Sequence, residues 1–94
     1  MPTFIMLSTL TDEGAKTIKS NPERIREVNK EVEKLGAAVR AQYAVLGPYD
    51  FVSVVEAADS AAVARISAEL ASRGSIKLTT LVAIPIDEFI GSLK

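Results

Sequence analysis

The chain lacks cysteine and histidine altogether among its 94 residues. The absence of cysteine excludes disulfides, thiolate zinc sites, iron–sulfur clusters and cysteine nucleophiles. The absence of histidine removes the commonest general base and the commonest ligand of transition metals. We therefore expect neither a metal nor any other cofactor, and the missing residue types argue against an enzyme.

The sequence also lacks an excess of charge of either sign. It contains 11 Lys and Arg residues and 12 Asp and Glu residues, which gives a net charge of −1. Such a balance creates no basic field that would attract nucleic acid or anionic lipid, so neither nucleic acid nor a membrane is an expected partner. No apolar run reaches the roughly 18 residues that a membrane helix needs, and the N-terminus lacks the pattern of a signal peptide. A cytoplasmic protein is therefore the expectation.

Apolar residues, by contrast, are abundant: they make up 48% of the sequence, and the mean hydropathy is +0.21. The length predicts one domain, spanning residues 1–94, with a modest core. A domain of this size exposes much surface for each residue that it buries. We therefore infer that a partner covers part of its apolar surface.

The first half of the sequence predicts a strand followed by two helical segments. Residues 3–10 form an apolar run rich in strand formers. Thr11 is the expected cap of the first helix, in which Gly14 indicates either close backbone packing or a weak start. Asn21 is the expected cap of the second helix, with a proline at its first position, and Gly36 is placed to end it. The apolar face of the second helix comprises Ile25, Val28, Val32 and Leu35.

The last part of the sequence predicts a helix, a strand and a terminal segment. Asp59 or Ser60 is the expected cap of the helix. The last strand spans residues 76–84 and ends at Pro85, after which residues 87–93 form a short helix or arm. The inner face of the helix is expected at Val63, Ile66 and Leu70.

Between these two parts, the sequence predicts a hairpin whose exposed tip is the first candidate site. Strand-like residues 38–46 and 51–57 flank a turn in which Pro48 presets the backbone. Tyr49 and Asp50 then lie at the tip. They are either ordinary turn residues, with the tyrosine packed on a neighbouring subunit, or a phenol and a carboxylate that orient a ligand in a pocket.

The strand before this turn carries the second candidate site. Strict alternation predicts that Arg40 and Gln42 share one face of the sheet and that Tyr43 lies on the other. The polar pair either blocks aggregation at an edge strand or provides a polar handle in a cavity. We favour the edge-strand interpretation, because long apolar edges are commonly blunted in this way.

Other charged residues have simple structural interpretations. The pairs along the second helix, such as Glu31 with Lys34, are typical of a solvated helix face. Arg73, followed by Gly74, suits the end of the last long helix, where an anion site is disfavoured because a helix C-terminus repels anions.

The order of these elements, β-α-β-β-α-β, specifies an α+β fold: a ferredoxin-like sandwich with a four-stranded antiparallel sheet and two helices on one face. A solvated outer sheet face would show apolar and polar residues in alternation. Instead both faces are apolar, as in the first strand, where Ile5 and Leu7 alternate with Phe4 and Met6. We therefore predict that the sheet packs against a second copy in a homodimer or a larger homo-oligomer.

Residues 1–39, 41–57, 72–74 and 83–90 resemble the GYD domain family, whose glycine-tyrosine-aspartate motif corresponds to Gly47, Tyr49 and Asp50. The resemblance implies a small bacterial or archaeal cytoplasmic domain of uncharacterised function, related to the dimeric α/β-barrel proteins. That group includes cofactor-independent monooxygenases, enzymes similar to muconolactone isomerase and effector-sensing domains of transcription regulators. The catalytic histidines of several of those enzymes have no counterpart here, because the chain has no histidine.

Two functions therefore compete at this point. The first is a non-enzymatic oligomeric module that binds a small, largely apolar molecule or another protein. The second is a cofactor-independent enzyme, similar to a monooxygenase or lactone isomerase, on a small apolar substrate. Its polar groups would be Arg40, Tyr43, Tyr49 and Asp50, with Asp50 as a general base whose pKa burial must raise. A purely structural assembly without a ligand is a third, weaker interpretation.

Overall fold

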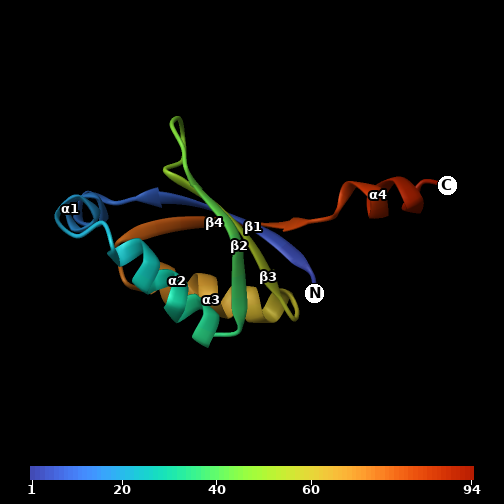
Figure 1. The fold of residues 1–94 in the computed structure, drawn as a ribbon, viewed down its shortest axis with the longest axis horizontal. Helices are drawn as coiled ribbons and strands as arrows, with labels where there is room; N and C mark the ends of the chain where they lie inside the picture. The colour runs from blue at the N-terminus through green and yellow to red at the C-terminus, as the bar shows by residue number, and fades with distance from the viewer.

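Four antiparallel strands form one sheet in the computed structural model, which describes all 94 residues (Figure 1). The strands are β1 (Thr3–Leu10), β2 (Ala37–Ala44), β3 (Phe51–Ala57) and β4 (Ile76–Ala83). Their order in the sheet is β2-β3-β1-β4, so that β1 and β3 are central and β2 and β4 are edges. The predicted ferredoxin-like α+β fold is confirmed.

Four helices accompany the sheet: α1 (Asp12–Ser20), α2 (Arg24–Lys34), α3 (Ser60–Ser72) and α4 (Ile86–Ser92). Helices α2 and α3 lie along one face of the sheet, and α1 lies at one end of it (Figure 1). Helix α4 follows an extended segment after β4 and stands apart from the rest of the fold (Figure 1). The chain thus consists of a sheet-and-helix body and a C-terminal arm.

The core lies between the sheet and helices α2 and α3. Alternate residues of the central strands point into it, and each of these helices contributes one apolar face. The face predicted for α3 is buried, whereas Leu35, predicted on the face of α2, is 44% exposed at the end of that helix. Side chains no more than 7% exposed form this core: Phe4, Met6, Val32, Ala37, Val55, Ala57, Ala62, Val63, Ile66 and Leu70.

Most predicted helix ends are confirmed by their hydrogen bonds. The Thr11 hydroxyl accepts from the backbone N–H of Gly14 at 3.1 Å, and the Asp59 carboxylate accepts from that of Ala62 at 2.8 Å. The start of α2 differs from the prediction, because the regular helix begins at Arg24. The backbone carbonyl of Asn21, and not its side chain, accepts from the Arg24 N–H at 3.1 Å in a preceding turn.

Gly14 lies where α1 touches the loop between α3 and β4. A Cβ atom at this position would lie 2.0 Å from the carbonyl oxygen of Ser75, so no side chain fits. The sequence left two interpretations of this glycine open, close backbone packing or a weak helix start, and the structure confirms close backbone packing. The contact fixes α1 against the loop, whose Gly74 and Ser75 carbonyls both accept from the Thr11 hydroxyl.

Candidate functional site

Asp50 joins the β2–β3 hairpin to the end of β1. Its carboxylate accepts from the backbone N–H of Leu10 at 2.8 Å, and its own N–H donates to the carbonyl of Ser8 at 2.8 Å. The loop of residues 45–50 is closed by a bond from Val45 N–H to the Asp50 carbonyl, also 2.8 Å. The carboxylate that the sequence places at an exposed tip therefore anchors the base of the loop to the sheet.

A β-bulge at Arg40 overturns the faces predicted for β2. The pairing with β3 slips between Val39 and Ala41, so that the alternation restarts one residue later. Gln42 consequently lies on the helix side, where it bonds Asn29 of α2 and Ser53 of β3. The sequence predicted Arg40 and Gln42 on one face, and that prediction is wrong. Arg40 instead pairs with Glu56 at the edge of the sheet.

Tyr43 lies on the outer face of the sheet, opposite Val52, and is 61% exposed. Tyr49 is half-buried in the loop beside Asp50. No hydrogen bond or ion pair links any two of Arg40, Tyr43, Tyr49 and Asp50. The four candidate residues therefore form no hydrogen-bonded or ion-paired cluster.

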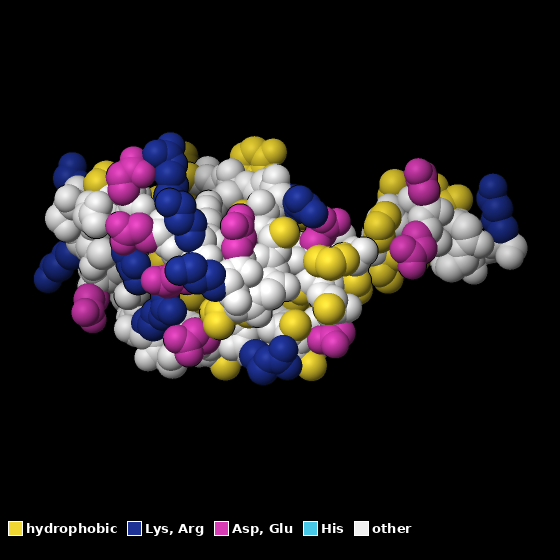
Figure 2. Space-filling model, turned by 60° about the horizontal axis from the view of Figure 1, so that its bottom comes forward, with side chains coloured by type: hydrophobic (Ala, Val, Ile, Leu, Met, Phe, Trp, Pro, Cys, Tyr) yellow, Lys and Arg dark blue, Asp and Glu magenta, His cyan; other side chains and the backbone are white.

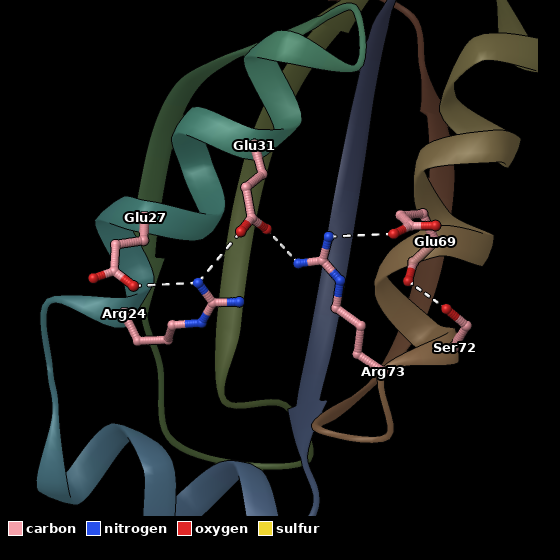
Figure 3. Close-up of polar contacts among 6 residues, drawn as sticks. All are labelled: Arg24, Glu27, Glu31, Glu69, Ser72 and Arg73. Carbon is pink, nitrogen blue, oxygen red and sulfur yellow. Dashed lines mark hydrogen bonds and ion pairs between the residues drawn. The ribbon is translucent and has the colours of Figure 1, made fainter.

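An ion-pair chain that sequence reasoning missed connects α2 to α3 (Figure 3). Glu31 of α2 bridges two guanidinium groups: its Oε1 lies 3.3 Å from Arg24 Nη1, and its Oε2 bonds Arg73 Nη1 at the end of α3. Two further carboxylates extend this ion-pair chain. Glu27 Oε1 lies 3.2 Å from Arg24 Nη1, and Glu69 Oε1 lies 3.3 Å from Arg73 Nη2. The predicted partner of Glu31 was Lys34, because sequence spacing shows only pairs within one helix.

The ion-pair chain also sets the charge state of Glu31, the carboxylate at its centre. The hydrogen bond from Arg73 holds the pKa of Glu31 below its usual value of 4.5, and the nearby charges of Arg73 and Arg24 act in the same direction. Desolvation is the second-largest influence and raises the pKa, but the hydrogen bond from Arg73 is stronger, so the pKa is lowered overall. Glu31 is therefore ionised in neutral solution and keeps both arginines engaged.

Beneath these arginines lies a cavity of about 140 Å³, bounded by the sheet, α1, α2 and the end of α3. Its walls are mainly apolar, with Ile18, Val28, Phe51 and Leu78 among them. None of the four residues predicted as a ligand site lines it.

The outer face of the sheet is apolar and has no helix over it. The strand pairings place Ala41, Val54, Ile5 and Leu81 in one row across the four strands. The adjacent row contains Tyr43, Val52, Leu7 and Thr79. This arrangement confirms the two apolar sheet faces that the sequence predicts.

The C-terminal arm exposes a second apolar surface. At the helical spacing of 100° per residue, four apolar side chains of the α4 segment fall within one narrow arc. They are Ile86, Phe89, Ile90 and Leu93, which are between 45% and 72% exposed. Figure 2 shows apolar atoms along the arm, whereas acidic and basic side chains cover much of the body.

The dimensions of the molecule reflect this projecting arm. The radius of gyration is 14.1 Å, compared with about 12 Å for a compact domain of this length. The longest axis measures 50 Å, against 29 and 19 Å for the other two. The arm thus holds its apolar ridge away from the core of its own chain.

The described residues contain no cluster of three or more acidic side chains arranged to hold a metal ion. None of the four helices has both the length and the apolar content that crossing a bilayer demands.

Two proteins from Thermus thermophilus are similar to this chain. A glutamine synthetase and cystathionine beta-lyase binding protein from that bacterium is 65% identical over 95 residues, covering 100% of both chains. The crystal structure of TTHA0845, from the same organism, superposes with a TM-score of 0.59 over 90% of this chain and 95% of the other, at 22% identity. This second likeness shows the fold alone.

The family resemblance that the sequence indicates over most of the chain is confirmed. Residues 4–93, from the first strand to the C-terminal arm, match the GYD domain. The chain belongs to the GYD domain family.

Proposed function

We propose that the protein is a cytoplasmic, non-enzymatic binding module that associates with glutamine synthetase and with cystathionine beta-lyase. The observation that carries this proposal is the 65% identity, over the full length, to a Thermus thermophilus protein named for binding those two enzymes. The uncovered apolar surfaces of the chain support a role in protein association.

We assign the contact with the enzymes to the C-terminal arm. Its ridge of apolar side chains has the spacing by which an amphipathic helix docks into a groove on a partner. The acidic residues Asp87 and Glu88 lie on the opposite side of α4, so one side of the helix is suited to burial and the other to water.

We assign a different role to the outer face of the sheet, namely association with a second copy of the chain. This face is broad and carries the same apolar rows in each copy, as a twofold interface requires. Because Leu81 is already 46% exposed, a Leu81→Lys variant alters this face without disturbing the core. Light scattering should show a dimer or larger assembly for the natural chain, and the variant should dissociate more readily. A monomer of 10.1 kDa for the natural chain would contradict self-association.

The enzyme-binding role is tested by surface plasmon resonance against immobilised glutamine synthetase and, separately, cystathionine beta-lyase. The natural chain should bind both, and a Phe89→Asp, Ile90→Asp double variant should bind at least about tenfold more weakly, since two buried apolar contacts are lost. Asp87→Asn, on the other side of the same helix, is the matched control. Equal binding by the double variant and the natural chain would refute the assignment to the arm.

The competing proposal of a cofactor-independent enzyme depends on Asp50 as a general base. The Asp50 carboxylate is already engaged by the backbone N–H of Leu10, and the residue lies outside the wall of the cavity. This arrangement favours the binding module over the enzyme.

A further inference from the structure

We propose that the cavity beneath the Arg24–Glu31–Arg73 ion-pair chain binds a small uncharged molecule: a single ring with one hydrogen-bonding substituent. The proposal is independent of the protein-binding role, because the cavity is an open pocket between the sheet and helices α1, α2 and α3 and not on the arm or on the outer sheet face. Its size, its polar wall and the charges at its edge each restrict the ligand.

The volume limits the ligand to about one ring. The cavity measures about 140 Å³. An engineered apolar cavity of about 150 Å³ in another protein is known to hold benzene, which has six heavy atoms. Twelve hydrophobic residues among the lining provide contacts for such a ring.

One wall of the cavity supplies the hydrogen-bonding groups. Asn29 donates to the side-chain oxygen of Gln42 at 2.7 Å, and Gln42 donates in turn to the Ser53 hydroxyl at 3.1 Å. These two hydrogen bonds fix the orientation of the Gln42 amide. The hydroxyl hydrogen of Ser53 and the second N–H of Gln42 are then available for a ligand. Both residues line the cavity, so the oxygen of a ligand hydroxyl finds two donors there, and the remaining lone pair of the Ser53 hydroxyl oxygen can accept the ligand's hydrogen.

The charges at the edge of the cavity select against ions. Arg24 and Arg73 line it, but Glu27, Glu31 and Glu69 already engage them, so that three carboxylates face two guanidinium groups. An anion would have to displace Glu31. A cation finds no Asp or Glu side chain among the lining residues. Desolvating either ion without a partner is unfavourable, which leaves a neutral ligand.

Phenol is the probe that tests this proposal, with benzoate as an anion and benzylamine as a cation of similar shape. In a titration followed by ¹H–¹⁵N NMR, phenol should shift the amides of Val28, Gln42 and Ser53 saturably. The two ions should bind at least about tenfold more weakly. Shifts confined to surface residues such as Leu46, or equal binding of benzoate, would overturn the proposal.

Two variants separate binding in the cavity from binding elsewhere. Val28→Phe places a ring in the cavity and should abolish the phenol shifts, whereas Val82→Phe, at a valine outside the cavity that is 69% exposed, should leave them unchanged. Ser53→Ala removes one hydroxyl and should weaken phenol binding about tenfold, the factor that corresponds to the loss of one hydrogen bond. Undiminished phenol binding by Ser53→Ala would refute the assigned polar wall, even if Val28→Phe fails to fold.

Discussion

Gly14 and Asp50 each connect one backbone segment to another that is distant in the sequence. Gly14 brings α1 against the carbonyl of Ser75, and Asp50 connects the hairpin to the end of β1. Neither residue packs a large side chain into the core. Their importance lies in contacts with the backbone, which are sensitive to single substitutions.

Gly14→Ala should destabilise the protein by about 1–3 kcal/mol, the usual effect of forcing extra volume into a packed site. The added methyl group would meet a backbone oxygen, which cannot move aside as the end of a side chain can. Urea unfolding measures the change. Gly91→Ala is the matched control: it also lies in a helix, but apart from its chain neighbours and the backbone of its own helix, no atom lies within 4 Å of its added methyl group. Equal stabilities of the two variants would contradict the close packing at Gly14.

Asp50→Ala should destabilise the protein by about 1.5–3 kcal/mol, because it removes a charged acceptor from the Leu10 N–H. Asp50→Asn keeps an oxygen acceptor and should therefore lose less stability than Asp50→Ala. Urea unfolding of both variants, with Asp87→Ala on the exposed arm as a control, gives the comparison. If Asp50→Ala matched the natural chain in stability, the carboxylate would have no anchoring role.

Helices α2 and α3 are connected by the ion pairs of Glu31, and this connection depends on pH. Because the pKa of Glu31 is lowered in the folded state, its contribution to stability is complete well above the unfolded value of 4.5. The contribution is lost as the pH falls below 4.5 and passes through the lowered pKa. Glu31→Gln should therefore unfold at a lower urea concentration than the natural chain at neutral pH, and the difference should shrink as the solution is acidified below the unfolded pKa. A difference that is constant over this range would contradict the linkage.

The sequence predicts individual elements better than it predicts contacts between them. Caps at Thr11 and Asp59 and the apolar helix faces are local signals, so the boundaries of most elements follow from the sequence, and the succession of these elements indicates the ferredoxin-like fold. The bulge at Arg40 is a property of the β2–β3 pairing and leaves no periodic signal, which is why the face of Gln42 was predicted wrongly. The partner of Glu31 likewise depends on how two helices lie in space.

At the scale of the whole molecule, the body and the arm present different surfaces. The body buries a core and forms an open cavity on one side of the sheet, and it leaves the other side apolar. The arm presents a separate apolar ridge. The sequence indicates an apolar excess and a terminal helix or arm. The cavity could not be predicted, because its walls come from both halves of the chain and meet only in the folded state.

Sedimentation velocity of the natural chain mixed with purified glutamine synthetase tests the binding role most directly. We predict that the small protein sediments together with the enzyme, and that the Phe89→Asp, Ile90→Asp variant sediments separately. The arm is exposed in the isolated chain, so the double substitution removes the ridge and leaves the core intact. If the natural chain sediments separately from glutamine synthetase at concentrations of tens of micromolar, the proposed binding of that enzyme is wrong.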